Sequence, residues 1–139
     1  TAQLNELIEI TRDGQRFYEH ASQQVRDSHL QALFATMSRG KTEVIEALKE
    51  AVVANHDVPA SGGTFLGPLQ RVYADTRATL STDEIEVYVA QLEDAEDRIL
   101  HAFEEALDKA DPDMRRLLSR EMPKVRACHE RMRNLKSTI

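Results

Sequence analysis

The sequence predicts an all-α fold, a four-helix bundle assembled from two copies of a helical hairpin. Apolar residues recur at alternating steps of three and four over four long segments, which is the spacing of amphipathic helices. The second half of the chain also echoes the first. Residues 92–102 repeat the pattern of residues 11–21, and residues 111–118 repeat that of residues 27–34. Each copy is predicted to be a helix, a short acidic turn and a second helix.

The first predicted hairpin covers residues 4–55. The seam of its first helix, over residues 4–25, is formed by Leu4, Leu7, Thr11, Gly14, Tyr18, Ala21 and Val25. Ser28 and Gln31 have the spacing of a capping box, so the second helix is expected to begin there. The apolar face of the second helix is formed by Leu30, Leu33, Phe34, Met37, Gly40, Val44, Leu48 and Ala51. Gly14 and its counterpart Ala95 are small, which indicates that two helices approach closely there or that a large side chain leans in.

The connection between the two hairpins determines the topology. Residues 58–63 contain a proline and two glycines, which break the helix. Residues 65–80 then predict a short fifth helix, with Pro68 in its first turn. At about 1.5 Å per helical residue, the connection is long enough to return along the bundle. The second and third long helices are therefore expected to be parallel and joined by one long crossover, as in ferritin-like folds.

The second predicted hairpin begins at residues 81–84, where a hydroxyl cap precedes two acidic residues. Its first helix presents Tyr88, Leu92, Ala95, Ile99, Ala102, Phe103 and Ala106. Pro112 lies at the first position of the last helix, where proline is favoured. The face of that helix is formed by Met114, Leu117, Leu118, Glu121, Val125, Cys128, Met132 and Leu135. Pro123 interrupts this pattern, so either the helix is kinked or two shorter helices meet there.

Length, charge and composition narrow the classes of function. A chain of 139 residues suits a single domain over residues 1–139. Its net charge of −6 argues against nucleic acid as a partner, because phosphate binding needs a basic surface. No apolar run approaches the ~20 residues of a spanning helix, so no membrane is expected. The one cysteine, Cys128, fits a reducing cytoplasm, and a homodimer through Phe65 and Tyr73 of the crossover is also predicted.

Several short segments resemble a family of bacterial ferritin-like four-helix-bundle proteins that is classed as a domain of unknown function. These segments are residues 4–7, Asp13-Gly14 with Phe17-Tyr18, residues 93–95, and residues 61–65 at the start of the crossover. The resemblance extends from Leu4 to Leu135. It implies a ferritin-like bundle and no particular chemistry, because none of these segments is a catalytic signature.

Ferritin-like folds raise the question of a di-iron site. Such a site takes a Glu from each of two helices and a Glu-x-x-His from each of the other two. The second helix has no histidine between Leu30 and Asn55, and Arg126 stands three residues before His129, so the full ligand set is missing. The chemistry-bearing residues that could form a reduced set are Asp13, Glu93, Glu96, Glu121 and His129. Because the full ligand set is absent, no cofactor is expected. Under the alternative hypothesis, in which the reduced set binds a metal ion, that metal would be iron or manganese.

Glu121 is the most unusual of these residues, because it falls on the apolar face of the last helix. A buried carboxylate has to be paired, hydrogen-bonded, protonated or bound to metal. Pairing with Arg39 or Lys41 is the first interpretation, and a metal ligand is the second. The sequence favours a non-enzymatic scaffold or interaction protein with a degenerate metal site. The alternatives are a metal-binding, oxidoreductase-like bundle and a small-molecule binder with a cavity beside Gly14 and Ala95.

Overall fold

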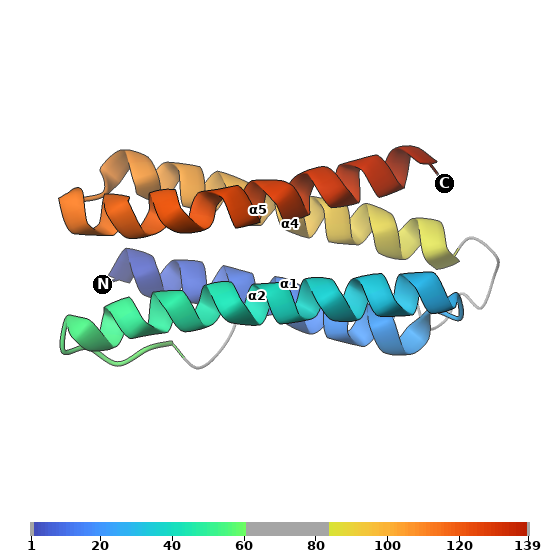
Figure 1. Cartoon of the computed structure of the whole chain (residues 1–139), viewed down its shortest axis with the longest axis horizontal. Helices are drawn as coiled ribbons and strands as arrows, with labels where there is room; N and C mark the ends of the chain where they lie inside the picture. The colour runs from blue at the N-terminus through green and yellow to red at the C-terminus, as the bar shows by residue number, and fades with distance from the viewer. Residues whose placement is uncertain (1, 61–83, 139) are drawn as a thin grey trace.

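The computed structural model describes residues 2–60 and 84–138, and within these ranges the regular secondary structure is entirely α-helical, without strands. The four helices are α1 (Ala2–Gln24), α2 (Ser28–Ala54), α4 (Glu84–Lys109) and α5 (Pro112–Thr138). They match the four long helices predicted from the apolar spacing. The predicted crossover helix over residues 65–80 lies outside the described residues. Figure 1 shows the four helices side by side as a long bundle.

In each hairpin, an aspartate in the turn caps the N-terminus of the second helix. The N-cap of α2 is Asp27, whose side chain accepts hydrogen bonds from the backbone N–H groups of His29 (2.8 Å) and Leu30 (3.1 Å). The predicted Ser28–Gln31 capping box is therefore wrong, and the Gln31 amide donates to the carbonyl of Val25 instead (2.8 Å). Asp111 caps α5 in the same way, accepting from the N–H of Met114 (2.8 Å). An aspartate therefore caps the second helix of each hairpin, and in the first turn it does so in place of the neighbouring Ser28.

The bounds of α5 test the predictions made for Pro112 and Pro123. Pro112 is the first residue of α5, as expected. Pro123 lies inside α5, which continues to Thr138 as one helix, so the alternative of two shorter helices is wrong. After α2, His56 has a φ of 60°, the left-handed conformation that commonly ends helices. The following segment turns back along α1, where the Asn5 side chain contacts Val58 (3.2 Å) and Ala60 (2.8 Å).

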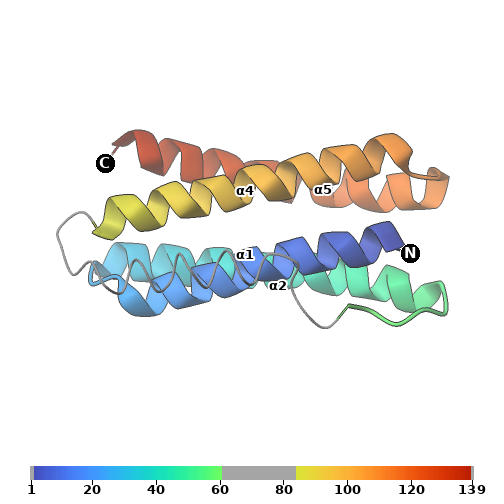
Figure 2. The same ribbon diagram turned by 180° about the vertical axis from the view of Figure 1, so that it is seen from behind.

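The helices form a four-cornered bundle in which α1 and α5 occupy opposite corners. α1 packs against α2 and α4, and α5 packs against α4 and α2. Neighbouring helices run in opposite directions, while α2 and α4 run in the same direction (Figures 1 and 2). This is the parallel relation that the long connection predicts. The end of α2 and the start of α4 consequently lie at opposite ends of the bundle.

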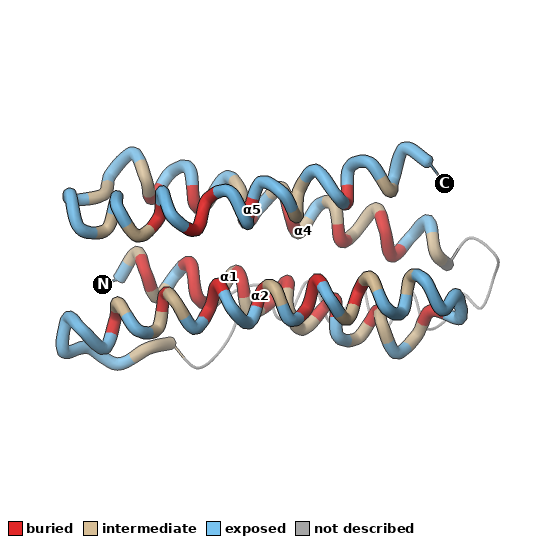
Figure 3. Tube along the Cα trace, in the orientation of Figure 1, coloured by how far each residue is buried: buried red, intermediate tan, exposed pale blue. Residues whose placement is uncertain are grey.

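Buried residues line the inner faces of all four helices (Figure 3). They form two apolar clusters, one at each end of the bundle. At the boundary, a Cβ added to Gly14 would lie 2.8 Å from Cδ1 of Ile99. The Ile99 side chain therefore fills the space that a larger residue would take, which is the second of the two explanations offered for Gly14. Ala95 is only partly buried.

Candidate functional site

The two apolar clusters are separated by a layer of buried polar side chains. On α2, Lys41 lies between Met37 of one cluster and Val44 of the other. On α4, Glu96 lies between Leu92 and Ile99 in the same way. All four helices contribute to its central group, which we call the four-helix site. It is formed by the buried Tyr18, Lys41 and Glu96 and by the partly buried Cys128 beside Lys41.

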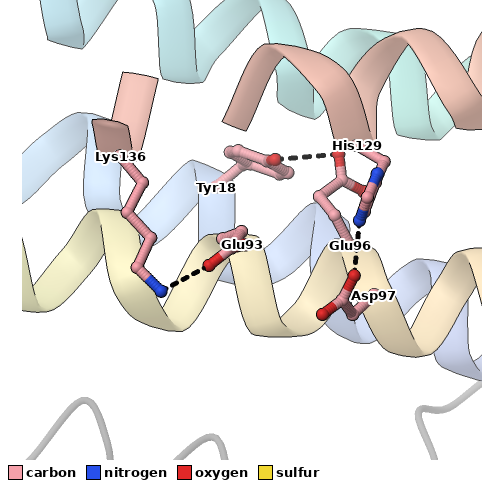
Figure 4. Close-up of polar contacts among 6 residues, drawn as sticks. All are labelled: Tyr18, Glu93, Glu96, Asp97, His129 and Lys136. Carbon is pink, nitrogen blue, oxygen red and sulfur yellow. Dashed lines mark hydrogen bonds and ion pairs between the residues drawn. The ribbon is translucent and has the colours of Figure 1, made fainter. Parts of the chain in front are cut away.

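Lys41 and Glu96 form an ion pair inside the bundle. The ammonium of Lys41 contacts Oε1 of Glu96, and the two side chains are 2% and 0% exposed. The other oxygen of Glu96, Oε2, accepts a hydrogen bond from the hydroxyl of Tyr18 at 2.9 Å (Figure 4). Because isolated buried charges are very unfavourable, each member of this group depends on the others. One carboxylate thereby joins α1, α2 and α4.

The pKa shifts of Tyr18 and Cys128 indicate the protonation state of these two groups of the site. Burial raises the pKa of Tyr18 well above its usual value, and the nearby charge of Glu96 raises it further. Burial also raises the pKa of the Cys128 thiol, although the Lys41 ammonium acts in the opposite direction. Cys128 therefore stays a neutral thiol at physiological pH, without the depressed pKa of a reactive nucleophile. The site therefore combines the Lys41–Glu96 ion pair with neutral phenol and thiol groups.

Glu121 is also buried, at 2% exposure, but its partners differ from those expected. Its carboxylate contacts Arg120 Nε at 3.3 Å and Lys124 Nζ at 3.2 Å, both from its own helix. The predicted pairing with Arg39 or Lys41 is wrong. Lys41 is already paired with Glu96, and Arg39 is an exposed side chain that donates to Thr36.

The remaining metal-ligand candidates each lie in separate contacts. Glu93 is paired with Lys136 at 2.7 Å, and His129 is paired with Asp97, both across the α4–α5 seam (Figure 4). Asp13 is buried on α1. In the part of the chain that the structure describes, no group of three or more His, Cys, Asp or Glu side chains lies close enough to hold a metal ion. Of the five candidates, Glu96 is the one that lies in the four-helix site.

Comparison with known proteins identifies the family. The family model "Domain of unknown function (DUF2383)" matches residues 1–109. The chain belongs to this DUF2383 family. Searches of curated proteins and of solved structures found no match.

The DUF2383 match covers three of the four residues of the four-helix site. It includes Tyr18, Lys41 and Glu96 on α1, α2 and α4, and it ends with the last residue of α4, Lys109. The hydrogen-bonded and ion-paired part of the site therefore lies within the family domain. Cys128 and Glu121 lie on α5, beyond the matched residues. Across the described helices of this DUF2383 chain, none is long and apolar enough to cross a membrane.

Sequence reasoning found Glu96 as an acid but missed its partners Lys41 and Tyr18 as site residues. The apolar face predicted for the second helix passed through Gly40, and that of the third passed through Ala95. In the structure Lys41 and Glu96 are buried at these levels, one residue further along the chain, and Gly40 and Ala95 are only partly buried. Both charges fit the same three-and-four spacing: Met37, Lys41, Val44 on α2 and Leu92, Glu96, Ile99 on α4. Opposite charges at matching seam positions were the available signal.

Proposed function

We propose that this DUF2383 chain is a ferritin-like, non-enzymatic bundle in which a lysine ammonium replaces the metal cation of the fold. The ion pair between Lys41 and Glu96 supports this proposal most directly. Ferritin-like metal sites bring carboxylates from all four helices to the middle of the bundle, where the metal neutralises them. Here the Glu96 carboxylate lies in the middle of the bundle, and Lys41 supplies the positive charge.

The topology supports the ferritin-like assignment. α2 and α4 are parallel, so one long connection joins two antiparallel hairpins (Figures 1 and 2). The two hairpins share both apolar clusters, which supports a single domain over residues 1–139. A cytoplasmic location stays a prediction from the single cysteine, Cys128.

A scaffold function follows from the fixed character of the four-helix site. The carboxylate of Glu96 has both oxygens engaged, by Lys41 and by Tyr18. A metal ion at this position would have to compete with a covalently attached ammonium. The alternative, a reduced set drawn from Asp13, Glu93, Glu96, Glu121 and His129, would require several of these side chains to leave their present partners.

The test is metal content by elemental analysis, on protein purified without chelator, together with the thermal midpoint of unfolding in the presence of Mn²⁺, Fe²⁺ or Zn²⁺. We expect less than stoichiometric metal and no rise in the midpoint, because a ligand that binds only the native state would raise it. Stoichiometric metal that is lost in Glu96→Gln but kept in Glu46→Gln, a surface control, would overturn the proposal. In that case the reduced-set hypothesis would replace it.

A further inference from the structure

Charge is distributed very unevenly over the second hairpin. α5 carries eight basic residues and three acidic ones, whereas α4 carries nine acidic residues and two basic ones. Part of this contrast is used inside the molecule, where Lys136 pairs with Glu93 and His129 with Asp97 across the α4–α5 seam. Glu96 and Glu121 are buried and paired, and most of the remaining charged side chains of the two helices are exposed.

The exposed positive charge of α5 that is not in an ion pair is carried by arginines. Five exposed arginines of this helix have no ion-pair partner among residues 2–60 and 84–138. One of them, Arg115, donates to the carbonyl of Ala110, and the other four are Arg116, Arg126, Arg131 and Arg133. Arginine is weakly hydrated and presents a planar fork of donors that matches a carboxylate. We call these four residues the arginine face of α5. It suits an acidic partner surface.

An acidic groove lies between α1 and α4. It has a volume of about 360 Å³ and an apolar floor that includes Leu7, Ile10, Ala102 and Ala106. Glu6 and Glu105 line it and are exposed, and neither has an ion-pair partner in the described part of the chain. Glu9 adds a third carboxylate, and Lys109 is the one cation among the lining residues.

The groove and the arginine face cannot meet within one molecule. The groove is formed by α1 and α4, whereas α5 packs against α4 and α2 and lies at the corner opposite α1. We propose that the arginine face of one molecule docks in the α1–α4 groove of a second copy, so that the chain self-associates head to tail. The occupant is assigned from charge, because the chain itself presents both the four arginines of that face and the carboxylates of Glu6 and Glu105, none of which is in an ion pair within the described residues.

The groove suits arginine side chains in two respects. Their aliphatic stems can cover the apolar floor, where Ala102 and Ala106 leave room, while the guanidinium groups reach the carboxylates at the rim. Because the two surfaces differ, the contact is heterologous and leaves one groove and one arginine face open at the ends. The assembly can therefore grow beyond a dimer.

Sedimentation velocity over a range of protein and salt concentrations tests this inference. We expect the average mass to rise with protein concentration at ~0.01 M salt and to return to the 15.8 kDa monomer at ~1 M salt. The reason is that the Debye length falls from about 30 Å to about 3 Å between these conditions. A protein that stays monomeric at low salt would overturn the inference and leave the groove for a different basic partner.

Charge reversal identifies the surfaces. Glu6→Lys with Glu105→Lys makes the groove basic, and Arg116→Glu with Arg126→Glu removes the net positive charge of the arginine face. Each variant alone should lose association by roughly tenfold or more, because the first places cations opposite the arginines and the second removes the charge that attracts the groove. An equimolar mixture of the two should associate again, since each variant then supplies the surface that the other lacks.

The matched control is Glu43→Lys with Glu50→Lys, two exposed positions on α2 that change the net charge by the same amount as the groove variant. It should associate like the wild type. Loss of association in this control, or a mixture that stays monomeric while the wild type associates, would overturn the inference. None of these substitutions alters the four-helix site, so failure here is distinguishable from failure of the proposed function.

Discussion

Glu96 and Glu121 are both buried carboxylates, yet the molecule satisfies them in opposite ways. Glu96 is held by groups from other helices, the buried Lys41 on α2 and Tyr18 on α1. Glu121 is held by its own helix, through Arg120 and Lys124, which are 68% and 52% exposed. The comparison teaches that burial of a charge does not by itself measure its structural importance. What matters is whether its partner would also be left in the interior.

Removing Lys41 should have the largest effect. Lys41→Met leaves Glu96 buried without its cation, so we expect a loss of about 3–5 kcal/mol in the free energy of unfolding. Urea unfolding at neutral pH measures it. The double variant Lys41→Met/Glu96→Met replaces the pair by apolar groups and should recover most of that loss. A double variant no more stable than Lys41→Met would show that the ion pair is not the source of the effect.

The same comparison explains what could be predicted from sequence. The four long helices were predictable, because each repeats apolar residues at helical spacing over more than 20 positions. The four-helix site was harder, because a seam was assumed to contain apolar or small residues. That assumption favours Gly40 over Lys41 and Ala95 over Glu96. In the structure the charged residue is the buried one in both cases.

The pattern misses both residues because each buried charge is acceptable only in the presence of the other. Either Lys41 or Glu96 alone would be a poor core residue, and a single-helix pattern correctly rejects each of them. Only the contact between α2 and α4 makes both acceptable, and that contact joins residues 55 positions apart in the chain. Glu121 was placed on the apolar face because it lies three residues after Leu118 and four before Val125. The structure buries it together with its neighbour Met122, but its partners were assigned to the wrong helix.

Tyr18 should have the next largest effect. Tyr18→Phe removes the hydrogen bond to the charged Glu96, so we expect a loss of about 1.5–3 kcal/mol, again measured by urea unfolding. A loss below about 0.5 kcal/mol would show that the carboxylate finds a replacement donor and that Tyr18 does not belong to the site.

Alkaline pH tests the same residue independently. The pKa of Tyr18 is raised in the folded protein, so the unfolded chain releases this proton first as pH rises. The stabilisation is complete below the unfolded pKa of about 10 and is lost above it, by up to about 1.4 kcal/mol per pH unit. The partly buried Cys128, whose pKa is also raised, should contribute a similar decline that begins at slightly lower pH.

Unfolding midpoints between about pH 8 and pH 11 separate these contributions, because the two unfolded pKa values differ. Cys128→Ala should remove the earlier part of the decline and Tyr18→Phe the later part. An unchanged slope above about pH 10 in Tyr18→Phe would show that the phenol is not protected from ionisation in the folded state.

Gly14 lies at the contact between α1 and α4, the two helices that carry Tyr18 and Glu96. Gly14→Ala should destabilise by about 1 kcal/mol, because the new Cβ would meet Ile99 Cδ1 at 2.8 Å. In an Ile99→Val background, which lacks that methyl group, the same substitution should stabilise by up to about 1 kcal/mol through helix propensity. Thermal unfolding of the four proteins measures this change of sign. Equal effects in both backgrounds would rule out the contact as the cause.

Glu121→Gln should have the smallest effect, less than about 1 kcal/mol, although Glu121 is as buried as Lys41. Arg120 and Lys124 reach solvent, so each remains hydrated when the carboxylate is neutralised. Glu96→Gln is the matched variant and leaves the Lys41 ammonium in the core. We expect its loss to exceed that of Glu121→Gln by at least about 2 kcal/mol in urea unfolding. Similar losses would mean that burial of the carboxylate, and not the location of its partner, determines its contribution to stability.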